Sequence, residues 1–222
     1  MVDIHTHLLF GVDDGPKTLE ESIEMIRDAI NIGFNEFYLT SHYNKGRFSN
    51  ENYDKNYEIL KTRCMELNLK VKLHKGNEIY LDENIDIILK EKKFNVIKNN
   101  FILVEFSPLT SPIVGKYLLK KVLKKKLIPI LAHIERYIYF KKNDFIELKK
   151  LGIKLQVNIS GEKPKHIIKL IKDGHIDYFA SDAHGVEKRS YKEIEKEREK
   201  NDKKKFANRI FTFFFRNIFR RT

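Results

Sequence analysis

The sequence predicts an α/β fold in which short strands alternate with helices around a parallel sheet, as in a (β/α) barrel. Short runs of β-branched and aromatic residues recur along the 222-residue chain, and longer amphipathic stretches separate them. No linker rich in Pro, Gly or Ser divides the chain. We therefore expect one domain over residues 1–222, with residues 1–189 forming a barrel that carries all the site residues and residues 190–222 forming a basic, aromatic helical region.

Seven strands are expected, each a short β-branched or aromatic run. They are Val2 to Thr6, Phe34 to Thr40, Val71 to Gly76, Phe101 to Glu105, Ile128 to Ala132, Ile153 to Val157 and Tyr178 to Ser181.

Helices are expected between these strands. In the first, from Thr18 to Ile32, apolar residues recur at helical spacing behind a Thr18 cap, and Glu21 stands three residues later, as in a capping box. The others are Asn52 to Leu67, Ile85 to Lys92, Tyr117 to Lys125, Asp144 to Leu151 and His166 to Asp173, with a charge-rich helix from Tyr191 to Lys205. Three of them should end at glycines, namely Gly33, Gly152 and Gly174.

Residues that can bind metal ions stand at nearly every strand end. Barrels place their chemistry at the C-terminal ends of the strands, and six of the seven ends carry His, Asp or Glu, whereas the sixth strand ends at Asn158. The set is His5, His7, His42, Glu78, Glu105, His133, Asp182 and His184. Imidazole with carboxylate suits Mn, Fe or Zn better than Ca or an Fe–S cluster. The sequence therefore predicts a metal site at this rim.

Other acidic and imidazole residues receive different expectations. His5 and His7 project from one face of the first strand, and the loop after it carries Asp13 and Asp14. Both aspartates can supply oxygen donors near the strand end, and Asp3 precedes the ligands on the strand. The remaining histidines, which lie off the strand ends, are expected to be structural: His74, His166 and His175.

Composition excludes several classes of protein. Residues 188–222 hold 13 basic and 5 acidic residues, which accounts for most of the net charge of +12 and leaves the barrel only mildly basic, so no nucleic-acid partner is expected. The single cysteine, Cys64, cannot form an internal disulfide, and Lys70 stands where a cysteine phosphatase needs arginine. Neither a signal-peptide pattern nor a membrane-spanning apolar run is evident, so we expect a cytoplasmic protein.

Several motifs resemble one family in order and spacing from Met1 to about Arg189. They are Asp3-Ile-His-Thr-His, Val12-Asp-Asp-Gly-Pro-Lys-Thr-Leu-Glu-Glu-Ser, Thr40-Ser-His, Gly76-Asn-Glu-Ile-Tyr, Val104-Glu-Phe, Ala132-His-Ile-Glu-Arg-Tyr and Ala180-Ser-Asp-Ala-His. The family is that of the PHP (polymerase and histidinol phosphatase) tyrosine phosphatases of bacterial capsule and exopolysaccharide loci. The resemblance implies a distorted seven-unit (β/α) barrel, in agreement with the strand count.

The resemblance also implies three metal ions, expected to be Mn²⁺ or otherwise Fe, Zn, Co or Mg. His5, His7, Glu78 and Asp182 would hold the first, Glu78, Glu105 and His133 the second, and Asp14, His42 and His184 the third. Under this grouping Asp14 binds metal, and Asp13 is expected to shape the loop. A water bridging two such cations becomes a hydroxide near neutral pH and can attack phosphorus. Arg136 and Arg189 match phosphate-binding arginines of the family, and Arg47 is a weaker candidate that a solvated loop explains equally well.

Two segments depart from the family pattern. The segment from Asn158 to His166 is shorter than its usual counterpart, which trims a loop at the mouth of the barrel. The tail over residues 206–222 is more aromatic than the family pattern and forms a basic amphipathic stretch. It can contact an anionic membrane surface peripherally, close the bottom of the barrel, or pack on another subunit of a homo-oligomer. We favour packing, because family members end in a helix of comparable placement.

The resemblance predicts a metal-dependent protein-tyrosine phosphatase that acts on the phosphorylated tail of a bacterial tyrosine kinase controlling polysaccharide export. One alternative is a PHP phosphatase for a small molecule such as histidinol phosphate. A nuclease-type or polymerase-associated PHP domain is disfavoured because we find no other domain in the chain. A non-catalytic binding module docked on a membrane through the tail is the alternative of a different class.

Overall fold

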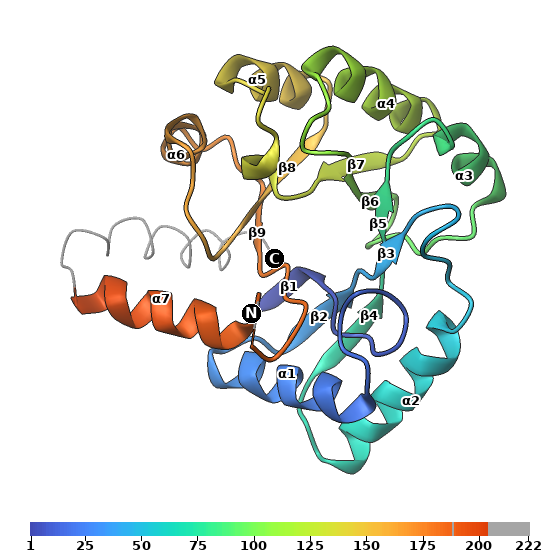
Figure 1. The fold of residues 1–222 in the computed structure, drawn as a ribbon, viewed down its shortest axis with the longest axis vertical. Helices are drawn as coiled ribbons and strands as arrows, with labels where there is room; N and C mark the ends of the chain where they lie inside the picture. Colours follow the sequence, from blue (N-terminus) through green and yellow to red (C-terminus); the bar gives the residue numbers. More distant parts are fainter. Residues whose placement is uncertain (188, 204–222) are drawn as a thin grey trace.

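Parallel strands form a ring with helices on its outside (Figure 1). The computed structural model of the chain describes residues 1–187 and 189–203. Its strands are β1 (Val2–Thr6), β2 (Glu36–Leu39), β3 (His42–Tyr43), β4 (Lys72–Lys75), β5 (Glu78–Tyr80), β6 (Phe101–Glu105), β7 (Ile128–Leu131), β8 (Lys154–Asn158) and β9 (Tyr178–Ala180). They pair in parallel in two sheets, β1-β2-β4 and β3-β5-β6-β7-β8-β9. The expected α/β distorted barrel is confirmed.

All seven predicted strands are present, and their ends lie within two residues of the predicted ones. The sequence pattern did not reveal β3 and β5, because two or three residues are too few for alternation to be visible. Both arise where the chain leaves the first sheet. At that point the Thr40 hydroxyl accepts a hydrogen bond from Thr6 N (2.9 Å) and replaces part of the strand ladder. As a result, His42 and Glu78 stand opposite each other in the second sheet.

The ring closes between the first and last strands. Asp182 N donates to His5 O, and His7 N donates to Ala183 O, each at 2.9 Å. This contact brings the first motif of the chain beside the segment that follows β9 (Figure 1). It also places the side chains of His5, His7 and Asp182 at one edge of the ring.

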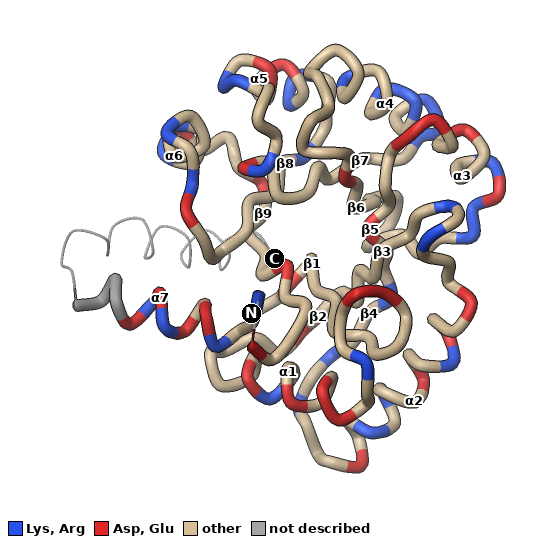
Figure 2. The backbone as a smooth tube through the Cα atoms, in the orientation of Figure 1, with Lys and Arg blue, Asp and Glu red and all other residues tan. Residues whose placement is uncertain are grey.

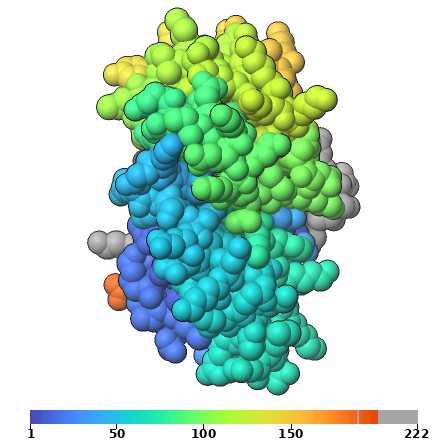
Figure 3. Space-filling view, turned by 90° about the vertical axis from the view of Figure 1, so that its right-hand side faces the viewer, coloured from blue at the N-terminus to red at the C-terminus, as the bar shows by residue number. Residues whose placement is uncertain are grey.

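The helices pack around the strands and bury the larger of two apolar clusters. They are α1 (Leu19–Asn31), α2 (Tyr53–Glu66), α3 (Ile85–Glu91), α4 (Pro112–Lys124), α5 (Lys142–Lys150), α6 (Lys165–Lys172), α7 (Tyr191–Lys203) and the one-turn 3₁₀ helix η1 (Ile134–Arg136). Figure 3 shows the face of the molecule on which α2 and α3 lie, where side chains cover the outside of the ring. Lysines and arginines lie mostly on these outer helices, whereas acidic residues also lie close to the centre of the ring (Figure 2).

Local signals in the sequence explain most helix ends. Thr18 and Glu21 form the predicted capping box of α1, and Gly33 follows its end with a φ of +97°. The predicted start of α4 at Tyr117 was wrong. This helix begins at Pro112, because Ser111 caps it by accepting from Val114 N and proline is favoured in a first turn.

The C-terminal prediction is tested only in part. Helix α7 begins at Tyr191, as predicted, and the structure describes it as far as Lys203. The tail over residues 206–222, with its membrane and packing alternatives, lies outside the described residues. None of the described helices is both long and apolar enough to cross a membrane.

Candidate metal centre

The predicted strand-end residues converge on one rim of the ring and form three adjoining clusters in the described chain. The first cluster consists of His5, His7, Glu78 and Asp182, all buried. Glu78 Oε2 lies 3.2 Å from Nε2 of both histidines, and Asp182 Oδ1 lies 3.3 Å from His5 Nε2. It contains the four residues expected to hold the first ion.

The second cluster consists of His42, Glu78 and Glu105. His42 Nδ1 lies 3.2 Å from oxygens of both carboxylates. The expected member His133 is also present, because its Nε2 lies 2.9 Å from Glu78 Oε1 and 3.5 Å from Glu105 Oε2. Glu78 therefore belongs to both clusters, as a bridging carboxylate should.

The third cluster contains His7, Asp14, His42 and His184. Asp14 Oδ1 lies 3.4 Å from His42 Nε2 and 3.5 Å from His184 Nε2. The rings of His7 and His184 stack with their centroids 3.7 Å apart. The expectation placed neither His42 in the second cluster nor His7 in the third, so the three clusters share more residues than the motifs suggested.

The donor atoms fit divalent cations. Glu78 Oε2, Asp182 Oδ1 and His184 Nε2 are buried, yet within the described chain they have no hydrogen-bond partner. Buried polar atoms are normally paired, because an unpaired one costs free energy. These three atoms lie in the clusters, and imidazole with carboxylate is a donor set for Mn, Fe, Zn or Co.

Burial and neighbouring charges shift the pKa values of the cluster residues in both directions. Burial opposes charge on His133, but Glu105 and Glu78 outweigh it and raise the pKa of His133 to about 10. Burial likewise opposes charge on Glu78, but His5 and its neighbours hold the pKa of this carboxyl well below its usual range. For His184, burial and the nearby His7 lower the pKa to about 2. Cations that bind here must displace the protons of the imidazoles with raised pKa values.

Asp13 and Asp3 have the supporting places that the sequence indicated. Asp13 Oδ2 accepts from His7 Nδ1 (2.7 Å) and from His42 N (2.8 Å), so it both fixes the loop and orients a candidate ligand. Asp3 is buried and accepts from Ser181 N (3.1 Å) and the Tyr191 hydroxyl (3.0 Å). It therefore ties β1 to the segment after β9 and to α7.

Backbone strain marks three residues of this rim. His133, Asp182 and Arg189 have φ values of +31°, +55° and +47°. Residues other than glycine rarely adopt such φ values, and they persist where the surrounding structure enforces them, often at functional sites. These backbone conformations are energetically unfavourable, and they fix the directions of the three side chains.

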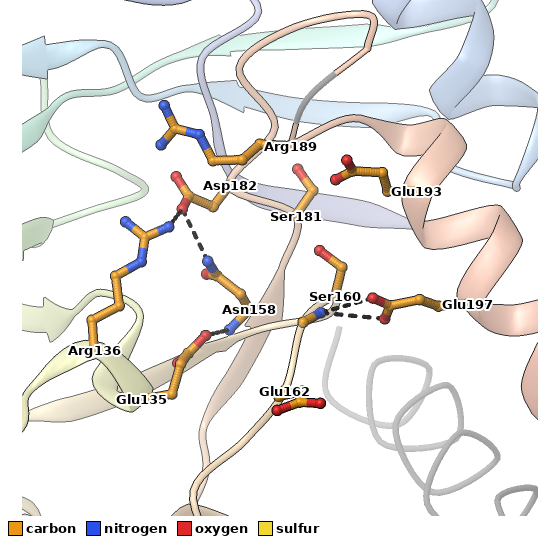
Figure 4. Close-up of a pocket in the computed structure, with 11 residues that line it drawn as sticks. Glu135, Arg136, Asn158, Ser160, Glu162, Ser181, Asp182, Arg189, Glu193 and Glu197 are labelled. Carbon is orange, nitrogen blue, oxygen red and sulfur yellow. Dashed lines mark hydrogen bonds and ion pairs between the residues drawn. The ribbon is translucent and has the colours of Figure 1, made fainter.

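A pocket of about 520 Å³ adjoins the first cluster (Figure 4). Arg136 and Arg189 line it together with Asp182, and Glu193 and Glu197 of α7 line another side. The Arg136 guanidinium pairs with Asp182 Oδ2, and Arg189 Nη2 lies 3.6 Å from Asp14 Oδ2. Burial would lower the pKa of Arg136, but Asp182 and Glu78 outweigh it and raise that pKa. Two guanidinium groups therefore face one cavity beside the clusters.

The weaker candidate, Arg47, lies farther from the centre. It is exposed and stacks on the Phe48 ring, which in turn stacks on His42. The three histidines expected to be structural lie outside the clusters. His74 contacts Glu36 at 2.9 Å, His166 stacks on Phe145, and His175 follows α6.

The sequence interpretation missed two polar residues at this rim. Gln156 and Asn158 lie on β8, the one predicted strand without a candidate ligand, and they bond to residues of the first cluster. Amide side chains carry no metal-binding signal. Their only hint was that Asn158 ended the sixth strand at the rim where the others end in ligands.

Comparisons with known proteins agree with this geometry. The tyrosine-protein phosphatase CpsB of Streptococcus agalactiae is 33% identical over 211 residues, which cover 85% of each chain. A solved structure from the pair YwqE of Bacillus subtilis and CpsB of Streptococcus pneumoniae, described as metal-dependent tyrosine phosphatases, superposes with a TM-score of 0.77. It is 26% identical and covers 98% of this chain and 95% of its own.

More distant structures share the fold alone. The structure of hisK from Listeria monocytogenes is 16% identical, covers 84% of this chain and 96% of its own, and has a TM-score of 0.54. The model of the family described as capsular polysaccharide synthesis, CpsB/CapC, matches residues 1–220, and the chain belongs to this family.

Proposed function

We propose that this chain is a metal-dependent protein-tyrosine phosphatase. The observation that carries the proposal is the set of three adjoining clusters of imidazole and carboxylate, the first of them fully buried, with two arginines at the neighbouring pocket. Family membership supports it, because relatives in the CpsB/CapC family are named tyrosine-protein phosphatases. The three clusters favour three ions, of which Mn²⁺ is our first candidate.

In this proposal the side chains divide the work. His5, His7, Asp14, His42, Glu78, Glu105, His133, Asp182 and His184 hold the cations. Bound divalent cations neutralise phosphoryl oxygens and activate water for in-line attack on phosphorus. Arg136 and Arg189 grip the remaining phosphoryl oxygens through charge-assisted hydrogen bonds. The bond from phosphorus to the tyrosine oxygen then breaks, and the phenolate, whose pKa is near 10, takes up a proton.

The substrate we propose is phosphotyrosine on a bacterial tyrosine kinase that controls capsular or exopolysaccharide synthesis in the cytoplasm. The family description, capsular polysaccharide synthesis, supports this assignment. A protein substrate also suits a pocket that is open beside the clusters (Figure 4).

One assay tests the proposal. Purified protein with Mn²⁺ is given a phosphotyrosine peptide, a phosphoserine peptide and histidinol phosphate, each with and without chelator. We expect hydrolysis of phosphotyrosine that chelator abolishes and added Mn²⁺ restores. His5→Ala should lose activity, whereas His74→Ala, which removes an imidazole outside the clusters, should retain it. Activity that survives chelation, or activity on histidinol phosphate alone, would contradict the proposal.

A further inference from the structure

Strand β8 carries no His, Cys, Asp or Glu, yet two of its side chains lie against the first cluster. Gln156 is fully buried and Asn158 is 8% exposed. They lie two residues apart on the strand, and successive side chains of a strand point to opposite faces, so both face the same side of the sheet. Their hydrogen bonds form one continuous chain that joins candidate ligands from β1 and the segment after β9.

The chain of bonds begins at two donors. His5 Nδ1 (3.1 Å) and the backbone His133 N (2.7 Å) both donate to Gln156 Oε1. Gln156 Nε2 then donates to Asn158 Oδ1 (2.8 Å), and Asn158 Nδ2 donates to Asp182 Oδ2 (2.9 Å). Figure 4 shows the last of these bonds beside the contact of Arg136 with Asp182.

The donor-to-acceptor direction of this series of hydrogen bonds is fixed at both of its ends. A backbone N–H can only donate, so Gln156 must present its oxygen to His133 N and its amide nitrogen to Asn158. Asp182 Oδ2 also accepts from the Arg136 guanidinium, which can only donate, so this oxygen is an acceptor and requires the same orientation of Asn158. Neither amide can flip without breaking a bond at its end.

The same direction determines which atoms of the ligands face the cluster. The proton of His5 is held on Nδ1, so the lone pair of Nε2 faces the cluster, 3.3 Å from Asp182 Oδ1. Asp182 Oδ2 is occupied by Asn158 and Arg136, whereas Oδ1 has no hydrogen-bond partner among the described residues. One imidazole nitrogen and one carboxylate oxygen are thus left aimed at the same point.

We propose that Gln156 and Asn158 are positioning residues that preset His5 and Asp182 for cation binding in the first cluster. The inference rests on the proposed metal dependence but not on the substrate. Residues that orient metal ligands typically contribute roughly ten- to hundredfold to metal affinity.

The test is a titration of metal-free protein with Mn²⁺, in which the free ion is followed by its electron paramagnetic resonance signal. We expect Gln156→Leu and Asn158→Leu to weaken the tightest site roughly ten- to hundredfold. Asn56→Leu is the matched control. Asn56 is 9% exposed and donates to Phe10 O (2.8 Å), and it contacts no member of the clusters.

Gln156→Glu separates positioning from packing. Glutamate keeps an acceptor for His5 Nδ1 and His133 N, so it should bind Mn²⁺ more tightly than Gln156→Leu does. If Gln156 only fills space, leucine should be the better substitute and the buried charge the worse one. Thermal unfolding of each metal-free variant identifies any that fail to fold, and Asn158→Leu offers an independent site on the same strand.

Wild-type affinity in both leucine variants, or affinity in Gln156→Leu equal to or above that in Gln156→Glu, would overturn the inference. This readout is metal binding, so it is distinguishable from failure of the proposed function. If the wild type binds Mn²⁺ and the Gln156 and Asn158 variants bind it more weakly, but no variant hydrolyses phosphotyrosine, the inference stands and the proposed phosphatase activity is wrong.

Discussion

Several candidate metal ligands at the rim also form hydrogen bonds that hold neighbouring side chains in place. Asp182 offers one oxygen to the first cluster and uses the other to hold Arg136 and Asn158. His7 offers Nε2 to the cluster and donates from Nδ1 to Asp13. Each candidate ligand of this kind has a partner that fixes the atom it presents, which is how metal-binding histidines and carboxylates are usually held.

Substitutions of Arg136 and Asp182 should impair different properties, namely catalysis on phosphotyrosine and Mn²⁺ binding. Arg136→Ala removes a charged donor from the pocket but no candidate metal ligand, so kcat/KM for a phosphotyrosine peptide should fall about 10- to 100-fold, as expected for charged hydrogen bonds of roughly 1.5–3 kcal/mol. Asp182→Asn should instead weaken Mn²⁺ binding, because it removes a carboxylate of the first cluster. Steady-state kinetics beside Mn²⁺ titrations measure the two effects.

Arg63→Ala is the control for this pair, because Arg63 lies on α2 and pairs with exposed Glu66. It should match the wild type in both measurements. If Arg136→Ala lost Mn²⁺ to the same extent as Asp182→Asn, the division between phosphate binding and metal binding would be wrong.

At the scale of elements, the loop between β1 and α1 depends on the absence of one side chain. A Cβ on Gly15 would lie 2.4 Å from the carbonyl oxygen of His7 and 3.0 Å from Asp13 Oδ1. The first contact is with the backbone of a candidate ligand, so a rotamer change cannot relieve it. The close approach lets Gly15 N donate to Asp13 Oδ1 (3.0 Å) and complete the loop that carries Asp14.

Gly15→Ala should therefore reduce both stability and metal binding. We expect a loss of about 1–3 kcal/mol in the free energy of unfolding, typical of overpacking in a tight site, together with weaker Mn²⁺ binding. Urea unfolding and Mn²⁺ titration measure these changes. Gly115→Ala is a useful comparison, because there the added Cβ, on the buried face of α4, meets the side chains of Phe140 and Phe106. It should cost stability and leave Mn²⁺ affinity unchanged.

The elements themselves were largely predictable from the sequence. Runs of β-branched and aromatic residues located β1 and β6 at their observed ends, and the Thr18–Glu21 pair located the start of α1. These signals are local, so they survive in a single sequence. The strands β3 and β5 were not predictable, because they form where the Thr40 hydroxyl and the second sheet capture a short segment. Such long-range contacts leave no periodic pattern.

The sequence predicted which residues form the candidate site, but it did not predict how they are grouped into clusters. Every strand-end His, Asp and Glu predicted as a ligand lies at the rim, because parallel strands bring their C-terminal ends together. The sharing of His7 and His42 between clusters depends on ring orientation, which sequence spacing does not encode. The hydrogen bonds of Gln156 were not predictable for the same reason, since their direction follows from contacts with His5 on β1 and with His133, which follows β7.

The whole molecule is held as a ring by its first and last strands, and the first cluster lies across that closure. His5 and His7 come from β1, Glu78 from β5, and Asp182 from the segment after β9. A cation held by these four side chains ties together parts of the chain that are far apart in sequence. Binding to the folded state alone raises stability by mass action, about 2.7 kcal/mol for a site at one hundred times its Kd.

Protonation of the clusters makes this stabilisation depend on pH. In the metal-free protein the pKa values of His7, His42 and His133 are raised: burial opposes their charge, and neighbouring carboxylates outweigh it. Their contribution to the free energy of unfolding is complete below the unfolded-state pKa of about 6.5. It is lost as pH rises toward the pKa of the folded state, which is about 10 for His133. The lowered pKa values of Glu78 and Asp182 contribute stability above about pH 4.5 that is lost at lower pH. The pKa of His184 is lowered to about 2, so its contribution to stability has the opposite sign to that of the other histidines and favours unfolding as pH falls below about 6.5.

We therefore expect the metal-free protein to be most stable between about pH 5 and 6.5 and to lose stability toward pH 8.5. Cations need deprotonated imidazoles, so the stabilisation by Mn²⁺ should increase over the same range. Thermal unfolding at pH 6 and 8.5, with EDTA and with excess Mn²⁺, measures both trends, and each kcal/mol should shift Tm by roughly 2–4 °C. An increase in Tm with Mn²⁺ that is smaller at pH 8.5 than at pH 6 would show that the clusters do not exchange protons for cations.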